Sequence, residues 1–238
     1  QSIGVVFPII ENKKFPCRVN AIYTPLKPIK EIKAPSGYGL DDRFDYVYDR
    51  IEKVSVSCSS GDLKACESIY KTLLSWAESN AAKRTGPSDE DGRHWNDTLT
   101  VNLYVAAPMI TAYSFVIQRI DIPQEEDKKI KKWLKKIVRR NEHLMYDKTY
   151  DYGGARGIPK RAHNHALSSA MSHLSLAILL GDNKTFKKPF KNWIGAVKYQ
   201  RKDGSLPIET RRGGRAMFYQ GRAMTALATI AVMAENQN

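Results

Sequence analysis

Apolar side chains recur along most of the chain at the spacing of an α-helix rather than that of a β-strand. Between Glu125 and Met145 the apolar positions fall three and four residues apart, which places them on one stripe of a helix. Lysines and arginines occupy the opposite face, which is the usual composition of a solvated surface, so no site is assigned there. The same spacing predicts further helices over residues 42–55, 62–82, 95–118, 163–180, 185–199 and 218–235.

Short segments that contain glycine or proline separate these predicted helices. Residues before about position 40 form an irregular segment with several prolines, and no stretch alternates in the manner of a strand. No low-complexity linker divides the chain. We therefore expect an all-α protein of antiparallel helical hairpins, organised as a single domain over residues 1–238 with an irregular N-terminal segment 1–40.

Charge changes this picture by indicating an anionic partner. Lys and Arg total 38 against 25 Asp and Glu, a formal net charge of +13. Such an excess suits nucleic acid, a membrane surface or an acidic polysaccharide, and charge alone does not choose among them. The chain has no nucleic-acid reader motif, no apolar run as long as a membrane-spanning helix and no basic leader, so we expect neither a nucleic-acid nor a membrane partner.

Three cysteines bear on the compartment. Cys58 and Cys66 flank the short segment SSGDLKA, which a disulfide would close into a loop in an oxidising compartment, leaving Cys17 over. The alternative is three buried, reduced thiols. The cysteines therefore favour secretion only weakly.

Two polar clusters are candidates for chemistry. His163, Asn164 and His165 stand at the start of a predicted helix, where free backbone N–H groups and the helix dipole favour anions. The two histidines lack the i, i+4 spacing of a helical metal site, and no cysteine or carboxylate set completes one, so we expect no metal and no other cofactor. The second cluster, IETRRGGRAMFYQGRA, places arginines just before a tyrosine; its bland interpretation is a solvated basic turn beside a core aromatic.

Both clusters resemble motifs of the alginate lyase family, polysaccharide lyases that cleave poly-mannuronate by β-elimination on an (α/α) toroid. The family's NNHSYW corresponds to HNHALS here, and its DGSLPLELxRGxRALxYH corresponds to DGSLPIETRRGGRAMFYQ, residues 203–220. The resemblance covers roughly residues 55 to 235 and implies an (α/α) toroid or incomplete barrel. We expect this toroid to be shorter or more open than those of the family, because these lyases usually carry several further helices after the tyrosine.

The resemblance also implies roles for four residues. Asn164, His165 and Arg212 would surround the substrate carboxylate, and Tyr219 would move the protons. An ionised carboxylate makes the neighbouring C5 proton very weakly acidic, so positioned donors must neutralise it before elimination. A tyrosine with an unperturbed pKa near 10 needs nearby cations to act as a base at ordinary pH, which Arg212 and Arg215 would supply.

Further residues are expected to bind substrate, and some positions depart from the family. One segment resembles the loop that covers the cleft of these lyases. It could equally be an exposed connector between two helices. The pair after the histidine is Leu167 and Ser168 rather than aromatic, and Gln220 replaces a histidine. The candidate substrate-binding residues are Arg211 and Arg215, then Lys83, Arg84, Arg93, His94 and Trp95 in that segment, and Tyr152 and Arg161 in a second loop.

The sequence thus predicts a secreted or periplasmic, monomeric polysaccharide lyase that acts on an acidic polysaccharide without a metal. Poly-β-D-mannuronate, the mannuronate polymer of alginate, is the first expectation. Glucuronan is the main rival because it shares the geometry and charge of the substrate. A protein that binds an acidic polysaccharide without cleaving it would use the same basic cleft and also remains open.

Overall fold

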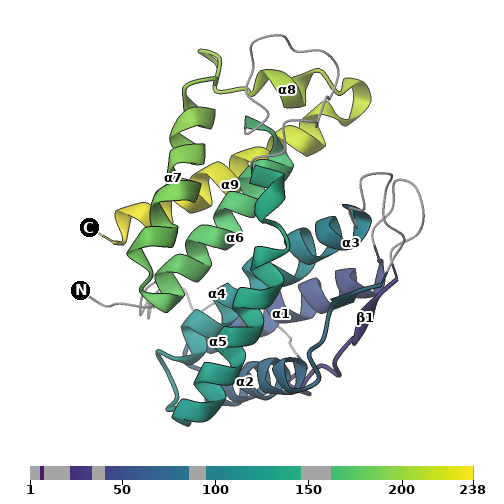
Figure 1. The fold of residues 1–238 in the computed structure, drawn as a ribbon, viewed down its shortest axis with the longest axis vertical. Helices are drawn as coiled ribbons and strands as arrows, with labels where there is room; N and C mark the ends of the chain where they lie inside the picture. The colour runs from purple at the N-terminus through teal and green to yellow at the C-terminus, as the bar shows by residue number, and fades with distance from the viewer. Residues whose placement is uncertain (1–5, 8–21, 34–40, 86–94, 146–161, 238) are drawn as a thin grey trace.

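The computed structural model describes residues 6–7, 22–33, 41–85, 95–145 and 162–237, and helices dominate them (Figure 1). The expected all-α class is confirmed; the described strands are β1 (Glu31–Ile32) and β2 (Lys83–Arg84), which pair in parallel. The longer helices lie close to their predicted positions. They are α1 (Arg43–Ser59), α2 (Leu63–Glu78), α4 (Ala107–Val116), α5 (Gln124–Arg139), α6 (Asn164–Leu180), α7 (Asn183–Val197) and α9 (Ala216–Glu235).

Local sequence signals explain where several helices begin and end. The Asp62 carboxylate accepts hydrogen bonds from the backbone N–H groups of Lys64 and Ala65 and so caps the start of α2. Asp182 caps α7 in the same way, and Gly181, with φ of 63°, ends α6 in the left-handed conformation that suits glycine. The turn between α6 and α7 is therefore short, and the two helices pack as an antiparallel hairpin.

The α1–α2 hairpin is closed by a disulfide. Cys58 and Cys66 are bonded to each other, with their Cα atoms 4.7 Å apart, which confirms the pairing suggested by their spacing. Both residues are fully buried. The bond joins the end of α1 to the start of α2 across the turn that Gly61 forms at φ of 98°.

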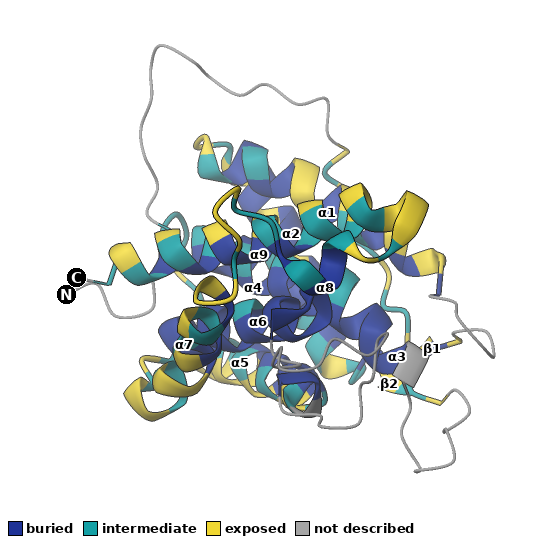
Figure 2. Cartoon of the chain, turned by 90° about the horizontal axis from the view of Figure 1, so that it is seen from above, coloured by how far each residue is buried: buried dark blue, intermediate teal, exposed yellow. Residues whose placement is uncertain are grey.

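Helix α6 is the centre of the packing. It is buried on almost every side and lies among α4, α5, α7 and α9, whereas α5 and α7 keep exposed outer faces (Figures 1 and 2). Two apolar clusters hold these layers together. The larger includes an edge-to-face series of aromatic rings, from Phe44 to Trp76 at 6.2 Å and from Trp76 to Trp133 at 6.1 Å.

The stretch predicted as one helix over residues 95–118 is divided. It runs as α3 (Trp95–Thr100), the π-helical segment η1 (Val101–Ala106) and α4. Pro108 has no N–H to donate to the carbonyl of Tyr104 one turn earlier, and its ring crowds that carbonyl, so the backbone widens there. Within the described residues only Asp97–Val116 is long and apolar enough to span a bilayer, but 72% of its most apolar window is buried, as in a core helix.

Candidate active site

A buried carboxylate joins the two motif regions. The short helix α8 (Pro207–Thr210) carries Glu209, which is fully buried. Its Oε1 accepts hydrogen bonds from the backbone N of Asn164 at 2.6 Å and from Asn164 Nδ2 at 3.1 Å, and its Oε2 lies 3.0 Å from the same Nδ2. The first residue of α6 is therefore held in one orientation by a residue 45 positions later.

The same carboxylate positions Arg212. Arg212 Nε lies 3.3 Å from Glu209 Oε2, and the centre of the guanidinium stands 4.0 Å from the centroid of the Tyr219 ring. Cations at this distance from an aromatic face are attracted to it. Asn164, Arg212 and Tyr219, three of the four residues assigned to catalysis, are thus linked through Glu209 and the arginine.

His165, the fourth of these residues, is buried and lies near several positive charges. It is only 6% exposed, and the His163 ring packs edge-on against it at 5.4 Å. Burial, followed by the nearby charges of His163, Arg212 and Arg222, lowers the pKa of His165 well below its ordinary value. His165 is therefore uncharged at neutral pH.

Glu209 contacts two of the candidate catalytic residues, and the sequence interpretation assigned it no role. Burial raises its pKa, while the hydrogen bonds from Asn164 and the charge of Arg212 act in the opposite direction. The available signal was its place in the matched motif, three residues before Arg212. Nothing in the local sequence shows that its partner lies at the start of another helix.

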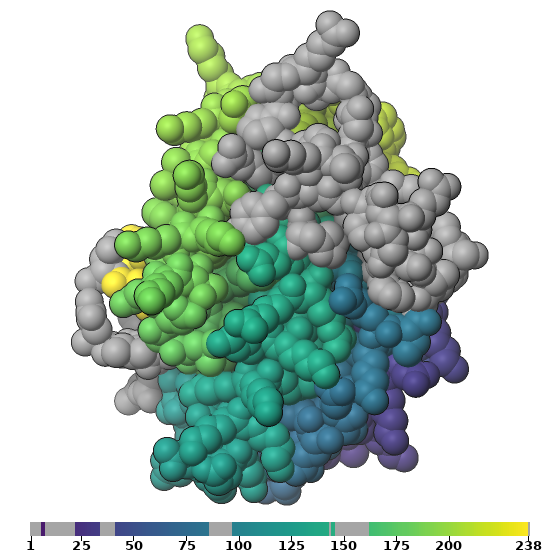
Figure 3. All heavy atoms as spheres, in the orientation of Figure 1, coloured from purple at the N-terminus to yellow at the C-terminus, as the bar shows by residue number. Residues whose placement is uncertain are grey.

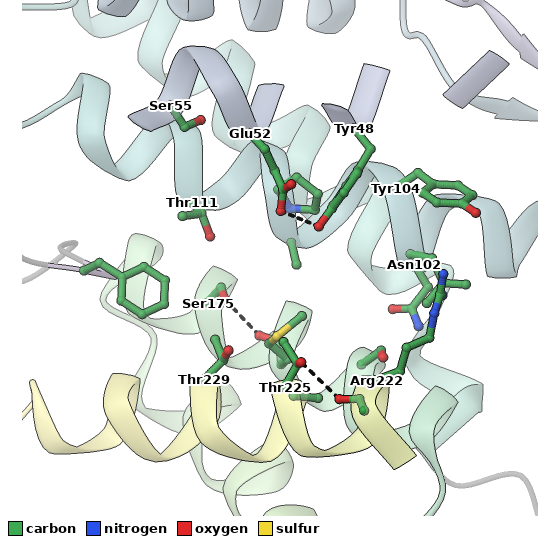
Figure 4. Close-up of a pocket in the computed structure, with 18 of the residues that line it drawn as sticks. Tyr48, Glu52, Ser55, Asn102, Tyr104, Thr111, Ser175, Arg222, Thr225 and Thr229 are labelled. Carbon is green, nitrogen blue, oxygen red and sulfur yellow. Dashed lines mark hydrogen bonds between the residues drawn. The ribbon is translucent and has the colours of Figure 1, made fainter. Parts of the chain in front are cut away.

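The described residues also enclose a cavity of about 940 Å³ (Figure 4). Helix α1 and the η1–α4 segment form one wall, and α6 and α9 form the other. Most of the lining surface is apolar and includes aromatic rings, which suit the faces of sugar rings, and hydroxyl groups reach it from both walls. The labelled polar residues are Tyr48, Glu52, Ser55, Asn102, Tyr104, Thr111, Ser175, Arg222, Thr225 and Thr229.

None of the four residues assigned to catalysis lines this cavity, but several of its lining residues contact or neighbour them. Asn102 lines the cavity and directs its Nδ2 to the backbone carbonyl of His165 at 3.5 Å. Phe218 lines it too, and its ring packs edge-on against Tyr219 at 5.3 Å. Ser168, about one helical turn after His165, is a third lining residue. The cavity and the cluster of these four residues are therefore neighbours, joined through Asn102, Ser168 and Phe218.

Arg222 is a second residue that the sequence interpretation missed. It stands three residues after Tyr219 on α9, so the two share a face of that helix, and this spacing was the available signal. Its guanidinium lies 4.7 Å from the Phe218 ring centroid. Burial and the Asp45 carboxylate raise the pKa of Tyr104, and Arg222 beside that phenol opposes the shift. The charge of Arg222 also contributes to the lowered pKa of His165. Arg222 therefore lies near both Tyr104 and His165.

The candidate substrate-binding residues are dispersed. Arg211 and Arg215 are exposed around the turn at Gly213, and Lys83 is exposed on β2. Arg84 is half-buried, directs Nη1 to Thr98 Oγ1 at 3.4 Å and lines a separate groove rather than the cavity. Trp95 begins α3, but its side chain is not described, and Arg93, His94, Tyr152 and Arg161 lie outside the described residues.

The positions that depart from the family motifs have distinct places. Leu167 is fully buried in the smaller apolar cluster, with residues of α7 and α9. Ser168 faces the cavity, where a small side chain leaves room. Gln220 Oε1 accepts a hydrogen bond from the backbone N of Leu206 at 3.0 Å, which ties α9 to the segment before α8.

Comparison with known proteins gives consistent results. Residues 29–238 match the family model described as alginate lyase, whereas no curated protein sequence matches. A histidine-to-alanine variant of alginate lyase A1-III, complexed with a tetrasaccharide, aligns with a TM-score of 0.66 and 19% identity, over 96% of this chain and 62% of that one. A tyrosine-to-phenylalanine variant, also with a tetrasaccharide, gives 0.67 and 20% over 94% and 62%.

The alginate lyase A1-III structure from Sphingomonas species A1 gives a TM-score of 0.63 and 18% identity, over 100% of this chain and 66% of that one. These similarities confirm the (α/α) toroid fold. The chain spans about three-fifths of the length of the two tetrasaccharide complexes.

Proposed function

Since the chain belongs to the alginate lyase family, we propose that it is a polysaccharide lyase that cleaves poly-β-D-mannuronate by β-elimination, without a metal. The observation that carries this proposal is the chain of contacts from Asn164 through the buried Glu209 to Arg212 and on to Tyr219, with an uncharged His165 close to Arg212. That arrangement brings a fixed positive charge and a phenol together next to a large cavity.

In the proposed reaction the substrate carboxylate is neutralised first. The Arg212 guanidinium, held against Glu209, supplies a fixed positive charge, and Asn164 supplies an amide oriented by the same carboxylate. His165, which is uncharged and buried, adds a neutral ring that can form hydrogen bonds. Donors held in place before the reaction lower the barrier, because they need no reorganisation when the second negative charge develops.

Tyr219 then moves one proton. As a tyrosinate it takes the C5 proton, the C4–O bond breaks as the C4–C5 double bond forms, and the phenol delivers the proton to the departing glycosidic oxygen. In mannuronate the C5 proton and the C4 oxygen lie on the same ring face, so a single phenol reaches both. Arg212 over the Tyr219 ring places a positive charge beside the phenol throughout.

The cavity would hold the polymer on either side of the cleaved bond. Its hydroxyl groups and rings suit sugar hydroxyls and sugar faces, and Arg222 gives it a cation for a second carboxylate. Ser168 at the cavity wall stands where the family motif has an aromatic residue. The selectivity between mannuronate and glucuronate chains is therefore proposed to differ from that of relatives with the aromatic residue.

We also propose that the protein works outside the cytoplasm, in a secreted or periplasmic setting. The support is the Cys58–Cys66 disulfide, because structural disulfides persist mainly in oxidising compartments.

The proposed activity has a direct test. Purified protein is incubated with poly-mannuronate, poly-guluronate, glucuronan and hyaluronan, and the ultraviolet absorbance of the new C4–C5 double bond is followed. We expect absorbance to rise fastest with poly-mannuronate. Tyr219→Phe should lower the rate at least about a hundredfold, since it removes the proton-transferring group while keeping the ring under Arg212.

The outcomes separate the alternatives. A rise with glucuronan alone would move the specificity and keep the reaction. No rise with any polymer, from a folded protein that still binds them, would favour a non-catalytic binding protein. Full activity in a folded Tyr219→Phe variant would sink the assigned mechanism.

A further inference from the structure

A second concave surface lies away from the cavity, between α5, the end of α2 and β2. This surface, which we term the α5 groove, has a volume of about 720 Å³ and shares no described lining residue with the cavity. Figure 3 shows the face on which α5 lies, with α2 on one side of it and α7 on the other. Its cationic lining residues are Arg84, Lys129, Lys132, Lys135, Lys136, Arg139 and Arg140.

A basic helix face is usually an ordinary solvated surface. Here, residues from other elements lie beside the basic face of α5, so that it forms one side of a groove. Ala77 and Asn80 close one side from the end of α2 and the turn that follows, and Trp133 lies at its base. Asn80 and Ala82 both have positive φ, 49° and 56°, which is uncommon for residues other than glycine. The turn holds this conformation next to the cations.

Contacts with that turn fix two of the cations. The Arg140 guanidinium donates through Nη1 to the backbone carbonyl of Ala82, and Lys136 Nζ donates to Asn80 Oδ1 at 2.8 Å. Burial, and then the charge of Arg84, lowers the pKa of Arg140, so two guanidinium groups are held near each other despite their repulsion. The charge of Asp97 acts on both groups in the opposite direction and offsets part of this repulsion.

Acidic groups of the described residues offset only part of this charge. No described lining residue of the groove is acidic. Around it, Glu78 pairs with Lys129 at 2.8 Å, and Glu126 also acts on Lys129. Asp97 acts on Arg84 and Arg140, and Asp182 acts on Lys135. Seven lining cations therefore face four carboxylates among the described residues, which leaves an excess of positive charge.

We propose that the α5 groove is a second, non-catalytic binding site for an acidic polysaccharide. Lys129, Lys132 and Lys136 recur along one face of α5 at helical spacing, so their side chains form a row roughly one turn apart. A polyuronate carries one carboxylate on every sugar and can match such a row repeatedly. The choice of polyuronate as ligand rests on the proposed function; the groove itself does not.

The test compares two charge-matched variants. The groove variant carries Lys132→Gln, Lys136→Gln and Arg139→Gln at exposed positions. The control variant carries Lys64→Gln, Lys191→Gln and Lys198→Gln, which remove the same charge from exposed positions outside the groove and the cavity. Both, and the otherwise unchanged chain, also carry Tyr219→Phe so that the polymer stays intact. Affinities for long poly-mannuronate and for a mannuronate tetrasaccharide are measured by calorimetry at low and physiological salt.

We expect the groove variant to bind the long polymer about tenfold more weakly, the sum of three surface charge contacts, and the control variant to lose less than about twofold. Affinity for the tetrasaccharide, which the cavity would hold, should stay the same in both variants. The effect should shrink at higher salt, because the contacts are exposed.

Other outcomes overturn the proposal. Equal losses of affinity for the long polymer in the groove and control variants would mean that only net charge matters. An unchanged affinity in the groove variant would mean that the groove does not bind the polymer. A loss confined to a single-stranded oligonucleotide, measured in parallel, would assign the groove to nucleic acid instead. Absence of lyase activity in the unmodified chain would refute the proposed function and leave this binding comparison readable.

Discussion

At the scale of single residues, the site depends on Glu209. It is fully buried, and it contacts both Asn164 and Arg212. A buried charge is retained at a cost unless its partners satisfy it, and here the partners are themselves the groups proposed to meet the substrate. Glu209 is therefore a positioning residue: in the proposed reaction it acts through its two neighbours.

Glu209→Gln should show this role. The amide keeps the size of the side chain but removes the charge that holds Arg212, and it brings an N–H group toward donors of Asn164. We expect kcat on poly-mannuronate to fall about a hundredfold, the usual cost of a displaced catalytic donor, with KM changed less than about threefold. Steady-state kinetics would check this, with the exposed Glu67→Gln as control. A variant that raised KM and kept kcat would contradict a positioning role.

Arg222→Gln should separate binding from chemistry. Arg222 lines the cavity next to Phe218, whereas Arg212 and Tyr219 do not line it. Losing one charged hydrogen bond to a substrate carboxylate should raise KM for poly-mannuronate about tenfold or more, with a smaller effect on kcat. The exposed Lys202→Gln, which removes the same charge, is the control. An unchanged KM would show that Arg222 only supports Tyr104.

At the scale of elements, the helices follow their sequence signals closely, because amphipathic spacing and capping residues act locally. Asp62, Asp182 and Gly181 mark helix ends in the sequence and do so in the structure. The π-helical segment was not predicted, because Pro108 reads equally well as a residue near the start of a new helix. This segment carries Asn102 and Tyr104, both of which line the cavity.

The disulfide is an element-scale property with a measurable effect. It closes a short loop between residues eight apart in sequence, so the expected gain from restricting the unfolded chain is about 2 to 3 kcal/mol. The double variant Cys58→Ala and Cys66→Ala should unfold roughly 5 to 10 °C lower in a calorimetric scan. A reductant should lower the Tm of the parent chain similarly and leave that of the variant unchanged. Equal Tm values in parent and variant would contradict a stabilising bond.

At the scale of the whole molecule, buried histidines couple folding to pH. The pKa of His165 is lowered by burial and then by neighbouring positive charges, and burial also lowers the pKa of His173. The unfolded chain binds a proton at each histidine near pH 6.5, whereas the folded chain does so only at lower pH. The stability from these groups is therefore present above pH 6.5 and is lost as pH falls below it.

We expect the free energy of unfolding to fall by up to about 1.4 kcal/mol per pH unit for each histidine below pH 6.5. Urea titrations between pH 8 and 5.5 would measure this loss. The raised pKa of Glu209 acts in the opposite direction, so Glu209→Gln provides a second curve without that contribution. His173→Gln should flatten the slope in part. Stability that stayed constant or rose toward pH 5.5 would be incompatible with two histidines buried without charge.

The sequence by itself determined the helices, the turn that the disulfide closes and the motifs of the catalytic cluster, since these depend on residues close together in the chain. Only the tertiary structure decided which of them meet. Glu209 reaches Asn164 across 45 positions, Arg222 faces the cavity from α9, and the basic face of α5 becomes a groove against α2 and β2. The physical reason is that such contacts follow from how helices pack around α6: the local sequence shows which face of a helix is apolar, but not which other helix packs against it.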